Sequence, residues 1–384
     1  MRFGAIIGGL LGLALSVWLL QNYGVGRILA LLANAGWFGV LSVIAFHLPQ
    51  IVASALGWCA ITGPATPRPP VRTYLLLRWI REGVNNLLPV AQIGGEFVAA
   101  RLLQRHGMKL APAIAATVAD LTMEMLTQIA FTLLGLVLLL QTVADSGIAG
   151  YVISGLALAA TLAAGFLAAQ WFGLASAIES TLLRLGRALG WAGTANVKGL
   201  HDALIACYRS PARVAQSALW HMISWLLGGI EVCLALHFLG HDVGLVPGLI
   251  IESLGQALKA AGFAVPGALG IQEGGYIIIG QLFGLSPETA IALSLMRRLR
   301  EVTLGIPALL AWPRAEARPV VDAEGRPIIR AEAYPVVADA RPSVVAEARP
   351  VLVAEARPIL DAEARPIIHP EIAPVVQPMP GLAR

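Results

Sequence analysis

A polar, helix-breaking stretch within an apolar region constrains the fold of this chain more than any other feature. Residues 85–96 read NNLLPVAQIGGE. Pro89 removes a backbone donor, and Gly94 and Gly95 loosen the backbone, so an ordinary membrane-spanning helix is excluded here. Non-helical backbone survives at membrane depth only where protein or a water-filled cavity satisfies its polar groups. We therefore expect the tip of a re-entrant hairpin, where transporters usually bind their cargo.

A similar stretch occurs 177 residues further along, at residues 264–273, AVPGALGIQE. Pro89 then matches Pro266, and Glu96 matches Glu273. Nine of the 36 consecutive pairs that begin at Pro89 are identical, and the register has no gap. An ungapped register that aligns proline, glycine and glutamate within apolar segments predicts an internal structural repeat.

Composition places the chain among multi-pass membrane proteins and excludes a soluble globule. Hydrophobic residues make up 57% and charged residues 13%, and the mean hydropathy is +0.74. The net charge of +4 comes from basic loops, which we interpret as topology signals and not as nucleic-acid contacts. The three cysteines form no CxxC pair, so we expect no disulfide framework and no metal site, and we expect no cofactor.

The apolar segments predict an all-α integral membrane domain with six full spans and two re-entrant hairpins. The expected spans are residues 3–20, 37–61, 111–140, 150–172, 214–239 and 288–312, and the expected hairpins are residues 84–103 and 263–283. The first segment lacks a convincing cleavage site, so a retained span is favoured over a signal peptide. His47, Pro49 and Gln50 predict a kink in the second span. His47 is interpreted as a satisfied interior histidine, with a proton relay as the alternative.

Two segments that precede the hairpins, residues 74–81 and 249–262, mix basic, polar and apolar residues as interfacial helices do. Basic loops flank the first hairpin on both sides and predict a cytoplasmic entry. Three full spans separate the hairpins, and an odd number inverts the second copy. We therefore expect an inverted-topology repeat, with repeat 1 at about residues 1–140, repeat 2 at about residues 150–312, and both termini on the cytoplasmic side of the inner (plasma) membrane.

From residue 313 the chain changes character, because a unit of roughly RPVVxAEA repeats to the end at residue 384. A proline about every eight residues forbids a long helix. We expect a mostly disordered cytoplasmic tail, with a docking array for a cytoplasmic partner as the alternative.

Charged residues recur at helical spacing in two of the expected spans. Asp120, Glu124 and Gln128 share one helix face, and Arg297, Arg300 and Glu301 share another. Each cluster begins about nine residues into its span, where a charge costs several kcal/mol unless it is paired or hydrated. The repeat aligns Asp120 with Arg297, which predicts an ion pair between them. The candidate substrate-binding residues are Asn85, Asn86, Glu96, Asp120, Glu124, Glu273, Arg297, Arg300 and Glu301.

These charges predict a hydrated groove between the two repeats that binds a lipid headgroup. The three arginines at positions 297, 298 and 300 outnumber the two acids of residues 111–140, Asp120 and Glu124, which favours an anionic group. The alternative is that the charges only hold the bundle together. Glu96 and Glu273 begin helices, so dipole stabilisation and a lining or proton-coupling role both remain open for them. Glu231, in the expected span 214–239, is a further candidate for the lining.

The basic segment before residue 85, the motif NNLLPVAQIGGE, the acids of residues 111–140 and the later VPGALGIQEGG together resemble the flippase-like membrane domain of lysylphosphatidylglycerol synthases. Within that family the chain is most similar to the hopanoid-biosynthesis-associated membrane proteins (HpnL type). The resemblance covers about residues 1–312. It implies movement of a lipid between leaflets, or hopanoid handling.

Synthase members of the family add a soluble aminoacyl-transferase domain where this chain has only its proline-rich tail, which argues against synthesis of an aminoacylated lipid. No GxSxG, HExxH, Walker or GxGxxG-acid motif is present, so we find no catalytic motif. A flippase-like lipid transporter is the first hypothesis. The alternatives are a membrane enzyme that modifies a lipid headgroup and a scaffold that recruits hopanoid-processing enzymes through its tail.

Overall fold

The protein is an all-α membrane protein, as the sequence predicts. The computed structural model describes residues 14–62, 68–88, 94–142, 199–262, 265 and 268–317, and within them the regular structure is helical. The helices are α2 (Val25–Ile61), α3 (Val71–Leu87), α4 (Gly94–Arg105), α5 (Leu110–Thr142), α8 (Leu200–Tyr208), α9 (Pro211–Phe238), α10 (Leu245–Ala261), α11 (Ile271–Gln281) and α12 (Pro287–Glu316). Residues 14–23 form a further helix before α2.

All of these elements belong to one compact unit, Met1–Arg330. A second unit, Ala331–Arg384, lies outside the described residues. Several predictions also lie outside them: most of the first span, the whole span 150–172, the tips of the two hairpins, and the tail after residue 317.

Three of the described helices, α2, α5 and α9, are long and apolar enough to cross a membrane. α12 is 30 residues long and comparable in length, but it carries four charged residues near its middle, at positions 297, 298, 300 and 301. These charges need partners inside the protein if the helix lies at membrane depth.

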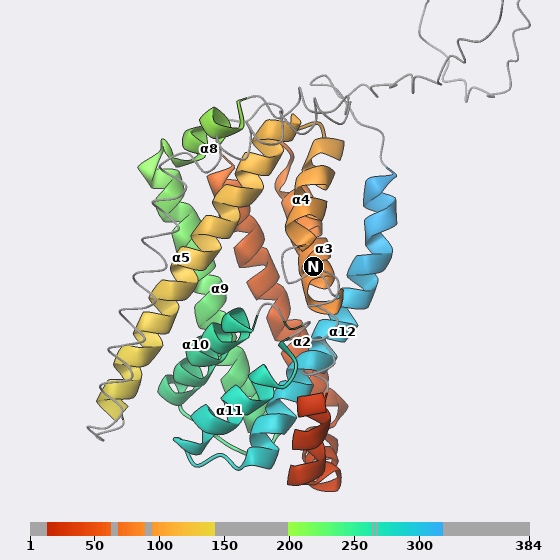
Figure 1. The fold of residues 1–384 in the computed structure, drawn as a ribbon, viewed down its shortest axis with the longest axis vertical. Coiled ribbons are helices and arrows are strands. Elements are labelled where there is room, and N and C mark those ends of the chain that lie inside the picture. Colours follow the sequence, from red (N-terminus) through yellow and green to blue (C-terminus); the bar gives the residue numbers. More distant parts are fainter. Residues whose placement is uncertain are drawn as a thin grey trace, which may run out of the picture. The chain divides into compact units, whose positions relative to one another are not determined.

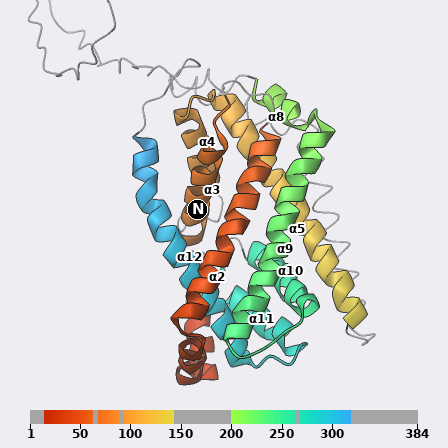
Figure 2. The same ribbon diagram turned by 180° about the vertical axis from the view of Figure 1, so that it is seen from behind.

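The helix boundaries follow the 177-residue offset of the sequence. α5 begins at Leu110 and α12 at Pro287, while α2 ends at Ile61 and α9 at Phe238. The packing shows the same correspondence between helices of the two halves. α3 packs against α2 and α12, and α10 packs against the corresponding pair, α9 and α5. α2 and α9 pack against each other, side by side in Figure 2.

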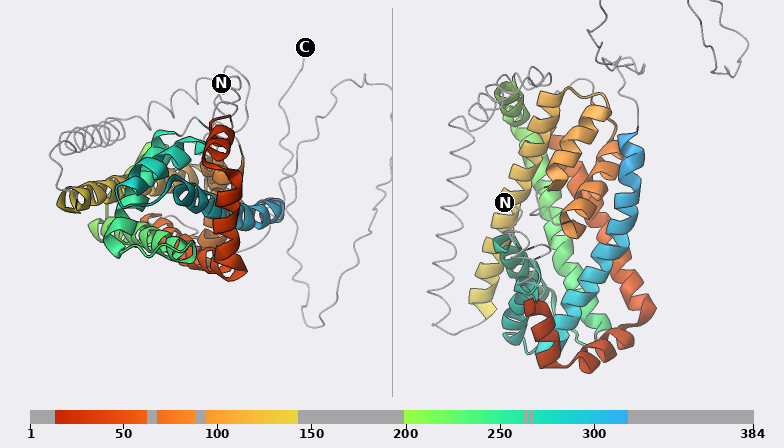
Figure 3. Two further views of the ribbon diagram at one scale, coloured as in Figure 1. Left: turned by 90° about the horizontal axis from the view of Figure 1, so that it is seen from below. Right: turned by 45° about the vertical axis from the view of Figure 1, so that its right-hand side comes forward.

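The two halves run in opposite directions. In Figure 1, α5 descends from the end that holds α8, whereas α12 rises toward that end. The α3–α4 pair lies toward one end and the α10–α11 pair toward the other, which the right-hand view of Figure 3 also shows. This is the arrangement expected of an inverted repeat.

The predicted interfacial helices are instead buried arms of the hairpins, which corrects the sequence analysis. α3 packs against α4, and α10 against α11, so each hairpin is longer than expected. Tyr74, Leu77 and Ile80 of α3 are fully buried, and Arg81 is 2% exposed. The mixture of apolar and basic residues resembles a membrane-surface helix, but here the basic side chains find carboxylates inside the protein.

One helix boundary agrees with the prediction and one differs. α2 begins at Val25, but its backbone is interrupted at Gly36, where φ is 62° and glycine alone is unstrained, so the helix after this break starts at residue 37, the expected start of the second span; Pro49 lies inside the helix. α12 continues through Pro313 to Glu316, past the expected end at residue 312. Its last turn is held by Arg101 of α4, whose Nε donates to Glu316 at 2.6 Å.

Glycines permit α3 and α12 to cross closely beside the charged region. A Cβ added at Gly83 would lie 2.9 Å from the Cβ of Ala308 and 3.1 Å from the carbonyl oxygen of Gly305. One turn away, Trp79 Nε1 donates to the carbonyl oxygen of Leu304 at 2.9 Å. The crossing therefore depends on both backbones being bare at this point.

Candidate functional site

The first group of charges joins the α3–α4 hairpin to α5. Arg78 donates through both terminal nitrogens to Glu124, at 2.8 and 2.6 Å. Arg81, one turn later on α3, reaches three carboxylates. Its Nη1 bonds Asp120, its Nη2 donates to Glu124 at 2.9 Å, and its Nε lies 2.6 Å from Glu96. Forked guanidinium–carboxylate contacts of this kind are short and directional, so they fix the hairpin against α5.

The second group joins α10 and α9 to α12. Arg297 forms a two-pronged contact with Glu252, in which Nη2 donates to Oε1 at 2.9 Å. Arg300 bonds Glu231 of α9. Lys259 Nζ donates to Glu301 at 2.8 Å.

The arginine–carboxylate pairs between hairpin arm and following helix are reversed in the second group, whereas Lys259 and Glu301 keep the order of the first group. In the first half the hairpin arm α3 supplies the arginines and α5 supplies the acids. In the second half the arm α10 supplies Glu252, and α12 supplies Arg297. The predicted Asp120–Arg297 pair is therefore wrong, because each residue is neutralised within its own half. The two residues do occupy corresponding positions in the repeat. Their partners, however, are the hairpin arms, which lie closer to each of them.

Histidines connect the two halves. His47 of α2 lies 3.0 Å through Nδ1 from Glu231 of α9, and 2.7 Å through Nε2 from Glu82 of α3. His221 of α9 lies 2.9 Å through Nε2 from Asp120 of α5. In the described part of the chain, every buried pair between a carboxylate and an arginine or lysine stays within one half, and the two buried pairs that cross between halves use histidine.

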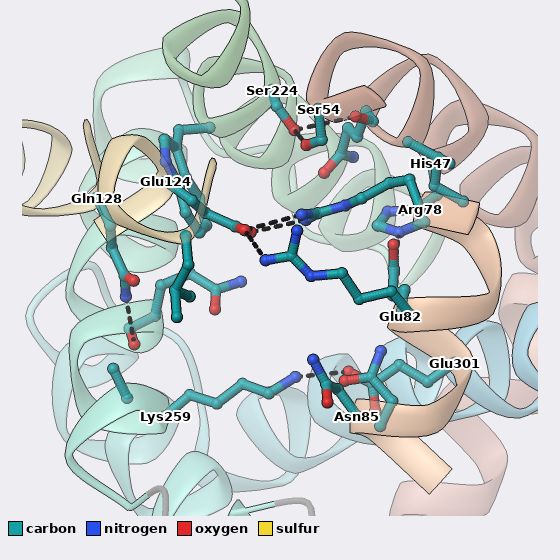
Figure 4. Close-up of a pocket in the computed structure, with 18 of the residues that line it drawn as sticks. His47, Ser54, Arg78, Glu82, Asn85, Glu124, Gln128, Ser224, Lys259 and Glu301 are labelled. Carbon is teal, nitrogen blue, oxygen red and sulfur yellow. Dashed lines mark hydrogen bonds and ion pairs between the residues drawn. The ribbon is translucent and has the colours of Figure 1, made fainter. Parts of the chain in front are cut away.

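A cavity of about 440 Å³ lies between these groups and is lined by residues of both halves. Figure 4 shows Arg78 reaching toward Glu124 on one side of the open space and Lys259 reaching toward Glu301 on the other. The charged residues of the lining are Arg78, Arg81, Glu82, Glu96, Glu124, Glu252, Lys259, Arg297, Arg300 and Glu301. The rest of the lining consists of His47, amides and hydroxyls from α2, α3, α5, α9 and α10, and the apolar residues Ile51, Leu121, Met125, Trp225 and Ala260.

The structure brings seven of the nine predicted residues to this cavity. They are Asn85, Asn86, Glu96, Glu124, Arg297, Arg300 and Glu301. Asp120 is fully buried behind Arg81 and does not line the space. Glu231 does not line the cavity either; it is bonded to Arg300 and accepts from Gln50 Nε2 at 2.6 Å.

Glu273, the remaining predicted residue, lies outside the cavity and stabilises the start of α11. Its Oε2 accepts from the backbone nitrogen of Gly270 at 2.8 Å, and its Oε1 accepts from Ser294 Oγ at 3.2 Å and Arg298 Nε at 2.8 Å. Of its two open roles, the structural one fits these contacts. Glu96, at the matching position, faces the cavity and holds Arg81, and it also accepts from Asn85 Nδ2 at 3.2 Å.

The cavity residues of the hairpin arms were not predicted from the sequence. They are Arg78, Arg81 and Glu82 on α3, and Glu252, Gln256 and Lys259 on α10. Each set recurs at spacings of three and four, the same signal that identified the sites on α5 and α12. Because these segments were predicted to be interfacial helices, their charges were expected to face solvent and were not considered as cavity residues.

These additional residues also change the charge balance. The lining has five cationic residues and five carboxylates, so the excess of arginine inferred from the sequence does not exist at the site. In the described ranges, no group of three histidine, cysteine or acidic residues could hold a metal ion.

An all-α membrane fold with oppositely directed halves and a paired, charged cavity between them defines a polytopic membrane protein with an internal polar site. Residues 5–309 match the model of the lysylphosphatidylglycerol synthase TM region. The chain therefore belongs to that family, whose members are membrane proteins that handle lipids. No curated protein and no solved structure matches it.

Proposed function

We propose that the protein is a flippase-like membrane protein that moves a lipid between leaflets and holds its headgroup in the cavity between the halves. The observation that carries the proposal is the cavity itself, polar and lined by ten charged residues from both halves. Its volume of about 440 Å³ suits a headgroup and not a whole lipid. The acyl or polycyclic part would then remain in the bilayer.

The cargo we propose is an anionic phospholipid or a hopanoid with a polar head. Arg78 has an Nε with no hydrogen-bond partner in the described part of the chain. Buried donors of this kind are normally satisfied, so a phosphate or hydroxyl oxygen is a suitable partner. Because the lining is balanced in charge, an anionic group would bind by exchanging with a carboxylate, not by filling a cationic pocket.

The pairs nearest the open space are the best placed for such an exchange. The side chains of Arg78 and Glu124 are 12% and 19% exposed, and those of Lys259 and Glu301 are 14% and 7% exposed. Arg297 and Glu252 are only 4% and 1% exposed. We infer that Arg78 and Lys259, one from each half, contact the headgroup, while Arg297 and Arg300 hold the cavity wall.

The basic residues at the helix ends support an orientation in the inner membrane. The end of the compact unit that holds α8 carries Arg72, Arg101, Arg105, Lys109, Arg209, Arg213 and Arg314. At the opposite end the described helix ends and loops carry Arg27 with Asp242 and Glu288. By the positive-inside rule the first end faces the cytoplasm, so the α3–α4 hairpin enters from the cytoplasm and the α10–α11 hairpin from outside.

Binding is tested by melting the detergent-purified full chain with and without phosphatidylglycerol or a polyhydroxylated hopanoid. A bound lipid stabilises only the folded state, so one of the two should raise the melting temperature of the wild type. Lys259→Gln should reduce that shift, and Arg101→Gln, which breaks an exposed pair outside the cavity, should leave it intact. No shift with either lipid, or equal shifts in all three proteins, contradicts the proposed site.

Movement is tested separately in vesicles that contain the protein and a fluorescent lipid. Loss of the inner-leaflet signal to an external quencher should require wild-type protein and should slow in Lys259→Gln. A lipid that is chemically converted in these vesicles would instead indicate the alternative, an enzyme that modifies the headgroup.

A further inference from the structure

The hydrogen bonds of His47 specify its protonation state. A neutral imidazole has one N–H donor and one acceptor nitrogen. Both ring nitrogens of His47 lie at hydrogen-bond distance from carboxylate oxygens, Nδ1 at 3.0 Å from Glu231 and Nε2 at 2.7 Å from Glu82. A carboxylate without its proton only accepts, so two hydrogens must be shared among the three groups. The arrangement therefore contains one proton more than a neutral histidine between two ionised glutamates.

The neighbours of Glu231 place that proton on His47. Glu231 Oε1 bonds the permanent cation Arg300, and Oε2 accepts from Gln50 Nε2 at 2.6 Å. Three donors on one carboxyl group favour its ionised form. With His47 protonated, Glu82, Glu231, His47 and Arg300 sum to zero charge. Without the proton they would leave a net negative charge in a buried site, which is costly.

The other helices packed on α2 supply no competing partner for His47. From α3, Arg78 is engaged with Glu124. From α12, Arg297 is engaged with Glu252. From α5, Asp120 is engaged with Arg81 and His221, and Glu124 is engaged with Arg78. Glu82 lines the cavity and is 23% exposed in its side chain, so it gives the proton a route to water.

We propose that His47 is a proton-binding site, an imidazolium held between Glu82 and Glu231 that fastens the two halves of the protein together across the cavity. Release of the proton to the cavity leaves one N–H for two carboxylates. One hydrogen bond is then replaced by a contact between a nitrogen lone pair and a carboxylate oxygen, which repel each other. The bond between α2 and α9, or the bond between α2 and α3, must loosen.

The placement of the site gives this loosening a use. The buried arginines and lysine are paired within each half, so these pairs do not resist separation of the halves, whereas the His47–Glu231 contact does. A proton that binds and leaves here would couple the relative position of the halves to pH. The use of that coupling in lipid movement rests on the proposed function, but the proton site itself does not.

The protonation state is measured by nitrogen NMR of the full chain, labelled with ¹⁵N-histidine and reconstituted in phosphatidylcholine vesicles at about pH 8, where ordinary histidines are neutral. The chain has seven histidines, and the signal absent from His47→Gln identifies His47. We expect that signal to show two protonated ring nitrogens. His237→Gln is the matched control, because His237 pairs with Asp242 at an exposed site, and it should leave the His47 signal unchanged.

Glu82→Gln serves if His47→Gln does not fold, and it tests the fastening. The side-chain amide can donate to Nε2, so His47 should become neutral at the same pH. The proton on His47 stabilises the contact between the halves and is lost as pH rises. The melting temperature of the wild type should therefore fall between about pH 6 and pH 9, and the melting temperature of Glu82→Gln should fall less. A neutral His47 signal in the wild type, or the same fall in both proteins, overturns the proposal. Neither result depends on whether added lipid binds.

Discussion

The Arg297–Glu252 pair offers the sharpest test of how this structure is held together. Glu252 binds both terminal nitrogens of Arg297, and the two side chains are 1% and 4% exposed. Replacing Arg297 by glutamine leaves Glu252 ionised and buried, with Gln256 Nε2 at 2.8 Å as its remaining side-chain donor. Replacing both residues, as Arg297→Gln with Glu252→Gln, removes the charge together with its partner.

The expected magnitudes differ widely between these variants. Breaking a buried pair from one side costs about 3–5 kcal/mol, whereas removing both partners is often close to neutral. At roughly 2 °C per kcal/mol for a chain of this size, the single variant should lose about 6–10 °C in melting temperature. The double variant should recover most of that loss. The interaction energy in the double-mutant cycle is then on the order of 3 kcal/mol.

The assay is thermal melting of the detergent-purified full chain, with Arg101→Gln as a control. Arg101 pairs with Glu316, but its side chain is 63% exposed. Its loss should cost less than about 1 kcal/mol. The cycle between Asp120→Asn and Arg297→Gln should be additive, because these residues have separate partners. The assignment of pairs is refuted if the Arg297–Glu252 double variant loses as much melting temperature as its two single variants lose together. It is also refuted if an interaction energy appears in the Asp120–Arg297 cycle and not in the Arg297–Glu252 cycle.

Three further predictions concern packing, topology and the tail. Gly83→Val should lower the melting temperature through its clash with α12, whereas Gly274→Ala, where nothing lies within 4 Å of an added Cβ, should not; equal effects would show that the crossing is loose. In a cysteine-free background, a cysteine at Lys109 should label from the cytoplasm and one at Asp242 from outside, and labelling from one side would contradict the inverted orientation. A chain that ends at Arg330, the end of the compact unit, should still insert and melt like the full chain, and loss of inserted protein would make the tail structural.

The sequence alone predicted the helical membrane class and the repeat because both rest on local pattern. Apolar segments identify spans without reference to partners, and proline and glycine identify their interruptions. The offset seen at Pro89 and Pro266 reappears as the offset between the start of α5 and the start of α12. Charges at spacings of three and four on α5 and α12 also identified cavity residues on both helices, since helical spacing alone decides which residues share a face.

The partners of those charges could not be predicted, because they depend on which element lies next to which. The sequence gives no distance between Asp120 and Arg81, and the repeat register suggests a different pairing. An amphipathic pattern such as that of α3 is shared by helices at a membrane surface and by helices whose polar face meets other polar groups inside a protein. Tertiary contact distinguishes the two cases, and here Glu96, Asp120 and Glu124 draw α3 inward.

The pairing of buried arginines within each half has a consequence for how the chain is made. Membrane proteins are inserted as they are synthesised, and an unpaired arginine resists entry into the bilayer. Arg78 and Arg81 are followed about 40 residues later by the acids of α5, and Glu231 and Glu252 precede the arginines of α12. Each half thus emerges from the ribosome with the counter-charges of its own arginines. The contacts of His47 with Glu231 and of His221 with Asp120 can form only once the second half exists.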